Sequence, residues 1–254
     1  LSIGWIYFCR RRCCRIKQVR IEEAGPYVDV VVYPISKGRS DRRERGAARS
    51  CTSDLRQKLN NKTAASKFRR LIATNFKPSD YVVSLTYSDA SLPQTPERAR
   101  DGYLKPCINR LRQTFRDLGE DPLKYMYVTE GLHGDKRLHH HMIVPDVPDV
   151  KEIIRELWPH GHVGFERISS RGYDTWASYL TKEPRKTGRR RVGDRMWTPS
   201  LGLKKPEVAM YEVADDFRYE PPAGVVITHN EDWQAEWFCC QYVSYYKPDY
   251  LTEN

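Results

Sequence analysis

The chain has no long hydrophobic run, and this absence argues against an integral membrane protein. Its apolar N-terminal segment, residues 3–8, is much shorter than the roughly 20 residues that cross a bilayer. The basic stretch that follows lacks the small-residue cleavage pattern of a secretory signal. Mean hydropathy is −0.71 over 254 residues, of which 39% are hydrophobic, so we expect a cytoplasmic protein with a sizeable core and no membrane partner.

Regularly spaced cysteines and a phosphate-cradling glycine loop are also missing. The 7 cysteines are odd in number and irregularly spaced, which argues against a disulfide framework. Cys9, Cys13 and Cys14 could join Cys51 in a zinc site, but their spacing matches the usual paired pattern poorly, and we expect reduced thiols. Because no Gly-Lys-Ser/Thr loop occurs, we expect no ATPase helicase domain within this sequence.

What the chain has in excess is positive charge. It carries 43 Lys and Arg against 33 Asp and Glu, a formal net charge of +10. Such a balance favours a polyanionic partner, most simply nucleic acid. Two basic runs are candidate phosphate contacts, although the first could equally be a solvated linker. Their nucleic-acid-binding candidates are Arg42, Arg43 and Arg45 in the first run and Arg185, Lys186, Arg189, Arg190 and Arg191 in the second.

Two strands joined by a turn are predicted between residues 124 and 144, where aromatic and β-branched segments flank glycines. Alternate residues of a strand share a face, so His139 and His141 should project together, with His140 on the opposite face. If the strands pair through the turn, Glu130 lies beside the two imidazoles. Two imidazoles and one carboxylate form a plausible site for a divalent metal, although a His-rich strand can also be a solvated face.

The elements around this hairpin follow the order of a ferredoxin-like fold. Each is predicted from hydrophobic spacing, turn residues and helix stops. They are a strand at 81–87, a helix at 104–118, the hairpin, a helix at 149–158 with Asp149 as N-cap in a capping-box variant, a strand at 163–168 and a helix at 174–183 stopped by Pro184. This order predicts an α+β fold, with an antiparallel sheet backed by helices.

We divide the chain into three segments. Residues 1–75 form a basic N-terminal extension with a strand at 28–33, a basic loop and a helix at 53–75. Residues 76–190 form the core domain. Residues 191–254 form a C-terminal extension whose many aromatic side chains could stack on unpaired bases, but more often such residues pack on a core.

A second group of chemically useful residues lies in the last predicted helix of the core. Tyr179 and Lys182 are three residues apart, so on a continuous helix they share a face. A tyrosine next to a cation could be a covalent nucleophile once its weak phenol is activated. Taken alone, Tyr-x-x-Lys is weak evidence, because any helix can show it by chance.

The order of three motifs resembles that of the HUH-type rolling-circle replication initiators, the Rep proteins of small circular phages and plasmids. The motifs are Val-Ser-Leu-Thr-Tyr at 83–87, His139-x-His141 and Tyr179-x-x-Lys182. The resemblance covers about residues 55–190. One departure is His140, which replaces the bulky apolar residue usual between the two histidines.

The resemblance implies a fold and a reaction. The fold would be the HUH endonuclease fold, a ferredoxin-like sheet of the RRM or palm type, with the two extensions added. His139, His141 and Glu130 would hold Mg²⁺ or Mn²⁺. Tyr179 would attack a phosphate of single-stranded origin DNA, and Lys182 would help to place that phosphate. The products would be a 5′-phosphotyrosine link and a free 3′-OH that primes rolling-circle replication.

With one motif tyrosine, the chain resembles a single-tyrosine initiator, and Tyr173 is expected to be structural. The His160-Gly-His162 segment is predicted to be a loop rather than a second ligand pair. Expected partners are single-stranded origin DNA, the origin duplex or hairpin, and a host helicase and DNA polymerase. A relaxase or transposase of the same superfamily would share the chemistry. A non-catalytic nucleic-acid-binding module would not, and its insensitivity to EDTA would distinguish it.

Overall fold

The computed structural model describes residues 16–35, 54–131, 136–182, 196–235 and 238–248. The chain forms two compact units, which we describe separately. The central unit is Ala48–Lys205, and the terminal unit combines Leu1–Ala47 with Pro206–Asn254. None of the helices in the described ranges is long and apolar enough to cross a membrane.

The central unit is built on a five-stranded antiparallel sheet with the order β6-β3-β5-β4-β7. Its strands are β3 (Tyr81–Leu85), β4 (Met126–Glu130), β5 (His139–Val144), β6 (Val163–Arg167) and β7 (Thr198–Pro199). Helix α3 (Lys105–Asp117) follows β3, and α4 (Val150–Leu157) follows β5. The resulting β-α-β-β-α-β order is that of a ferredoxin-like unit, and it confirms the predicted α+β fold class.

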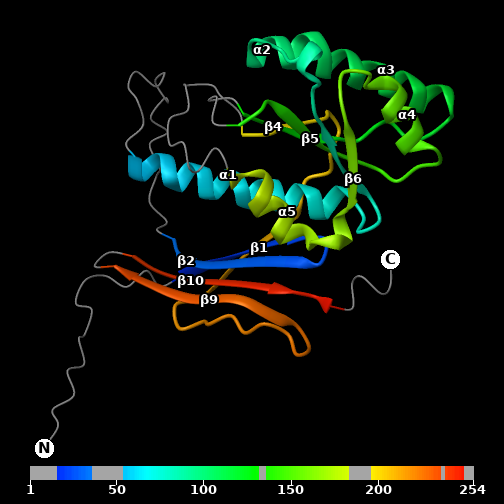
Figure 1. The fold of residues 1–254 in the computed structure, drawn as a ribbon. Helices are drawn as coiled ribbons and strands as arrows, with labels where there is room; N and C mark the ends of the chain where they lie inside the picture. The colour runs from blue at the N-terminus through cyan, green and yellow to red at the C-terminus, as the bar shows by residue number, and fades with distance from the viewer. Residues whose placement is uncertain (1–15, 36–53, 132–135, 183–195, 236–237, 249–254) are drawn as a thin grey trace, which may run out of the picture. The chain divides into compact units, whose positions relative to one another are not determined.

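Each face of the central sheet has its own helices (Figure 1). Helices α3 and α4 cover one face, and α1 (Asp54–Asn75) and α5 (Gly172–Leu180) lie on the other. Between the sheet and α3/α4 lies the hydrophobic core of this unit, which includes Leu85, Leu111, Phe115, Met142 and Ile154. Because strand side chains alternate, the residues between these apolar positions face α5, where the site described below is found.

Several predicted helix ends differ from the structure. Asp149 precedes α4 with a positive φ of 56° and makes no side-chain cap hydrogen bond, so the predicted capping box is wrong. Pro106 lies in the first turn of α3 as expected, and that helix is extended backwards by a π-helical turn at Ala99–Leu104 and a short α2 (Pro96–Arg98). Helix α5 ends at Leu180 rather than continuing to Glu183, because the backbone of Thr181 leaves the helical conformation.

The terminal unit is a second five-stranded antiparallel sheet, with the order β8-β1-β2-β10-β9. Its strands are β1 (Ile16–Ala24), β2 (Tyr27–Pro34), β8 (Glu207–Ala214), β9 (Val226–Ala235) and β10 (Phe238–Tyr246). Alternate residues Val28, Val30 and Val32 of β2 share a buried face with Val243 and Tyr245 of β10. The chain ends therefore make a sheet and a small core of their own.

These units do not follow the three predicted segments. Helix α1 was assigned to the N-terminal extension, but it belongs to the central unit and lies next to α5. The aromatic C-terminal segment pairs with the N-terminal strands β1 and β2. The nicking and joining role of residues 76–190 stays a prediction.

Candidate active site

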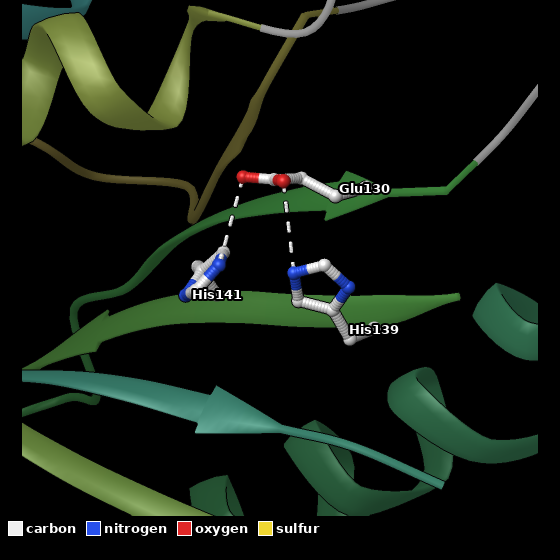
Figure 2. A group of neighbouring side chains, drawn as sticks. All are labelled: Glu130, His139 and His141. Carbon is white, nitrogen blue, oxygen red and sulfur yellow. Dashed lines mark ion pairs between the residues drawn. The ribbon is translucent and has the colours of Figure 1, made fainter. Parts of the chain in front are cut away.

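The pairing of β4 with β5 brings the three predicted metal ligands together. Glu130 is the cross-strand partner of His139, and Val128 is the partner of His141. Figure 2 shows the carboxylate lying over both imidazoles. His139 Nε2 lies 3.6 Å from Glu130 Oε2, and His141 Nε2 lies 3.6 Å from Glu130 Oε1. One ligand atom from each residue lies within 4.8 Å of the other two, so the group could hold a metal ion.

Gly131 makes the exit from β4 possible. It has a φ of +83°, and a Cβ at this position would lie 2.8 Å from both the Lys136 carbonyl oxygen and the Leu138 Cα. Any side chain would therefore push the two ends of the hairpin apart. The glycine seen in the sequence as a turn signal is needed directly beside Glu130.

Hydrogen bonds on the far side of each ring orient the two histidines. His139 Nδ1 lies 2.8 Å from the carbonyl oxygen of Arg137, which can only accept, so Nδ1 carries the proton. His141 Nδ1 lies 3.0 Å from Ser84 Oγ on β3. Both rings can therefore present an unprotonated Nε2 toward Glu130, which is the arrangement of metal-ligating histidines with outer-shell partners.

The chemistry of this cluster fits a divalent metal. Glu130 is 4% exposed and His141 is 5% exposed, yet His141 Nε2 has no hydrogen-bond partner among the described residues. Burial, aided by the positive charges of nearby groups including Lys136 and Arg171, lowers the pKa of His141 to about 4. The imidazole is therefore neutral at pH 7, as a metal ligand must be. A buried, unpaired and uncharged nitrogen next to a carboxylate is an available ligand.

Lys136 supplies a positive charge at the edge of the cluster. Its Nζ lies 3.2 Å from Glu130 Oε2, with the lysine side chain 54% exposed. The buried carboxylate thus has a counter-charge in the absence of a metal. This lysine was not among the predicted site residues.

The predicted nucleophile lies next to the histidines. The ring of Tyr179, in the last turn of α5, meets that of His141 edge to face, with 5.6 Å between centroids and 76° between planes. Tyr179 is 38% exposed, so its hydroxyl is within reach of a solvent-borne substrate. The distance test that sequence reasoning posed, whether this tyrosine approaches the histidine pair, is met in ring-to-ring terms.

Arg171 is a neighbour of Tyr179 that the sequence did not point to. Its guanidinium lies 5.5 Å from the centre of the Tyr179 ring and 4.7 Å from that of Trp176. Two hydrogen bonds of 3.0 and 3.1 Å hold it to the Glu166 carboxylate of β6. A fixed guanidinium against an aromatic face restricts how that ring can turn.

Not every predicted residue is brought to the cluster. Lys182 is exposed and lies two residues beyond the end of α5, so the argument that it shares one helix face with Tyr179 is wrong. The predicted phosphate-contacting residues lie outside the described residues. They are Arg42, Arg43, Arg45, Arg185, Lys186, Arg189, Arg190 and Arg191.

His140 faces the opposite side of the sheet, as strand alternation predicts. It is fully buried, with Nε2 2.7 Å from Tyr87 Oη and Nδ1 2.9 Å from Thr129 Oγ1. Burial, with smaller effects of His139 and His141, lowers its pKa to about 3. His140 is therefore a neutral, hydrogen-bonded core residue and does not reach the ligand cluster.

The remaining candidate residues are structural. Tyr173 is buried and donates a hydrogen bond of 2.7 Å to the carbonyl oxygen of Phe76. The segment from His160 to His162 is a loop whose backbone pairs with residues 86 and 88 after β3. A Cβ on Gly161 would lie 2.4 Å from the Thr86 carbonyl oxygen, so only glycine fits this close approach.

Ser84 and Arg171 are the site residues that sequence reasoning missed. Ser84 is the single polar residue at the centre of β3, and it faces the histidines only because β3 lies beside β5 in the sheet. A serine alternating with buried valine and leucine was a signal that this face has a polar partner. Arg171 offered no comparable signal, because it precedes α5 in a polar turn.

The part of the chain that carries this cluster is similar to a known protein family. Residues 80–186 match the model of the family described as replication-associated protein ORF2. No curated protein and no solved structure gives a significant match. The matched span runs from β3 to just beyond α5, so it contains Glu130, both ligand histidines and Tyr179. The match confirms the resemblance to Rep-type replication initiators and supports a role in DNA replication.

Proposed function

We propose, from the similarity of residues 80–186 to replication-associated proteins, that the chain starts rolling-circle replication of a phage or plasmid by nicking and joining single-stranded DNA. The observation that carries this proposal is the position of Tyr179. Its ring lies 5.6 Å from that of His141, which belongs to the cluster with Glu130 and His139. A tyrosine hydroxyl beside such a ligand set suits metal-assisted phosphoryl transfer through a covalent intermediate.

Glu130, His139 and His141 would hold the metal, for which we propose Mg²⁺ or Mn²⁺. When bound, the ion supplies Lewis-acid charge at an oxygen of the scissile phosphate. The chain's own contribution is to keep both Nε2 atoms unprotonated and directed toward the carboxylate, through the hydrogen bonds at the two Nδ1 atoms.

Tyr179 is the proposed nucleophile. Its Oη forms a bond to phosphorus while the bond from phosphorus to the 3′ oxygen breaks. The phenolic proton passes to solvent, and the departing 3′ oxygen gains a proton. The products are a 5′-phosphotyrosine and a free 3′-OH that a polymerase can extend. In the reverse step, a 3′-OH attacks the phosphotyrosine and frees the tyrosine, so a circle can be closed.

Positive side chains would hold the DNA. We propose that Lys182 contacts the scissile phosphate, and that the basic runs around Arg42 and Arg189 neutralise phosphates along the strand. Because no Gly-Lys-Ser/Thr loop occurs in the sequence, unwinding of the origin duplex or hairpin falls to a host helicase.

The test is to replace the nucleophile. Tyr179→Phe should abolish the covalent adduct with single-stranded DNA, seen as a shifted band on a denaturing gel, while DNA affinity changes by no more than about twofold. Tyr173→Phe is the matched control, because it removes a buried tyrosine hydroxyl six residues earlier and should still form the adduct. Undiminished adduct formation by Tyr179→Phe would overturn the proposal.

A further inference from the structure

We propose that His140, the middle residue of the triple histidine, is a positioning residue that locks the register of β4 and β5 and so holds the metal ligands in place. The inference rests on the proposed metal site and concerns the opposite face of the sheet. His140 cannot act as a ligand there, because its ring lies among the core residues between the sheet and α3/α4. It acts through the strands that carry the ligands.

Both ring nitrogens of His140 are used. Thr129 Oγ1 lies 2.9 Å from Nδ1, and Tyr87 Oη lies 2.7 Å from Nε2. The rings of Tyr87 and Trp158 enclose the imidazole, with centroids at 5.7 and 6.0 Å. A fully buried imidazole with two partners has one favourable orientation, because turning the ring would leave a buried nitrogen and a hydroxyl unpaired.

These hydrogen bonds join the three strands that build the site. Thr129 is the cross-strand partner of His140, and it is the residue directly before Glu130. His140 itself stands between the two ligand histidines on β5. Tyr87 follows β3, the strand from which Ser84 orients His141. The network therefore connects, from behind, every strand that contributes to the ligand cluster.

The backbone of Tyr87 makes a second connection to the hairpin. Its carbonyl oxygen accepts hydrogen bonds of 3.2 and 2.9 Å from Arg137 Nε and Nη2. The carbonyl oxygen of Arg137 in turn accepts the Nδ1 proton of His139. Tyr87 thus restrains the hairpin through His140 on one face of the sheet and through the peptide that orients His139 on the other.

Three consecutive histidines make this restraint necessary. A shift of one residue in strand register moves every side chain to the other face. After such a shift, His140 would face the cluster, and His139 and His141 would enter the apolar core. Only the observed register gives His140 its partners Thr129 and Tyr87. An apolar residue at position 140 could fill the same space, but it would lack the hydrogen bonds that distinguish the two registers.

The test measures Mn²⁺ binding to the full chain by electron paramagnetic resonance, so it does not depend on DNA cleavage. Thr129→Val keeps the shape of the side chain and removes the hydroxyl, and Tyr87→Phe removes the other partner. Each should weaken Mn²⁺ affinity about tenfold, within the range seen when outer-shell partners of metal ligands are lost. Thr129→Ser should restore affinity to within about twofold of wild type, because it retains the hydroxyl.

Tyr103→Phe is the control for the aromatic cluster. The Tyr103 ring lies 5.5 Å from that of Tyr87, and its hydroxyl has no hydrogen bond to His140. It should bind Mn²⁺ like wild type. A role confined to folding would lower the thermal midpoint of the variants without changing the Mn²⁺ affinity of the folded protein.

The outcomes separate this inference from the proposed function. Wild-type Mn²⁺ affinity in both Thr129→Val and Tyr87→Phe would overturn the positioning role, while nicking by the wild type would leave the proposed function standing. An equal loss in Thr129→Ser would also overturn it, because the hydroxyl is still present there. Failure of the wild type to bind Mn²⁺ would overturn the inference together with the metal site of the proposed function.

Discussion

Replacing Ser84 by alanine should weaken metal binding while leaving the fold intact. Ser84 Oγ lies 3.0 Å from Nδ1 of His141, and this is the contact that fixes the tautomer and direction of that ring. Without it, the Nδ1 proton has no partner from β3, and the ring can exchange tautomers or rotate away from Glu130. The nucleophile Tyr179 and its contacts with α5 are unchanged.

The expected magnitude follows from two separate effects. Loss of an outer-shell partner costs roughly 10- to 100-fold in metal affinity, or about 1.4–2.8 kcal/mol. Loss of one neutral hydrogen bond in the metal-free protein costs about 1 kcal/mol of folding free energy. The second effect is too small to unfold a domain of ordinary stability, so the change in affinity can be measured on folded protein.

The assay is a titration of adduct formation against Mn²⁺ concentration, with Mn²⁺ binding measured in parallel. Ser84→Ala should require about tenfold more Mn²⁺ for half-maximal rate and should approach the wild-type rate at saturation. Ser88→Ala is the control, because Ser88 is exposed and makes no side-chain cap hydrogen bond. If Ser84→Ala needs no more metal than wild type, the orientation of His141 by β3 is not part of the site.

Three further predictions address the metal, the buried histidines and the nucleophile's neighbour. Excess EDTA should stop adduct formation and leave DNA binding unchanged, and added Mn²⁺ should restore the adduct; a reaction that persists in EDTA would contradict a metal-dependent mechanism. Lowering the pH from 7 to 5 in EDTA should destabilise the protein, because the pKa values of His141 and His140 are lowered by burial to about 4 and about 3, so only the unfolded chain takes up protons as the pH falls below the ordinary value. Each histidine should cost up to about 1.4 kcal/mol per pH unit below about 6.5, and a thermal midpoint independent of pH would contradict their burial in neutral form. Arg171→Met should slow adduct formation about tenfold with unchanged Mn²⁺ affinity, because the guanidinium contacts the Tyr179 ring and not the ligand cluster; single-turnover rates with wild-type values would show that Tyr179 is held by other contacts.

The hairpin could be predicted from sequence because its information is local. Alternation places His139 and His141 on one face, and the short turn forces antiparallel pairing with the strand that ends at Glu130. The register Glu130↔His139 then follows almost directly. The same logic assigned His140 to the other face, but it could not find Tyr87 as its partner, because that contact spans 53 residues.

The terminal sheet shows where local reasoning stops. Strand β1 lies in a stretch whose positive charge suggested an extension, yet it pairs with β8 through register partners such as Ile16 and Ala214. Neither strand is strongly hydrophobic, and each is stable only because the other supplies its hydrogen bonds. Pairings of such separation cost loop-closure entropy that no short sequence window reports. Only β2, with its run of valines, was evident in isolation.

The position of the nucleophile depends on contacts near the start of α5 rather than on the Tyr-x-x-Lys motif. Asp174, in the first turn, pairs with Arg69 of α1 at 3.1 Å, and Arg171, just before the helix, is held by Glu166 of β6. Tyr179 stands at the other end, one residue before the helix stops, with His141 as a ring neighbour. The helix is thus anchored to the sheet and to α1 where it begins, and it presents the tyrosine where it ends. A change in either anchor would displace the hydroxyl without touching a ligand, so anchor variants should lose rate while retaining metal affinity.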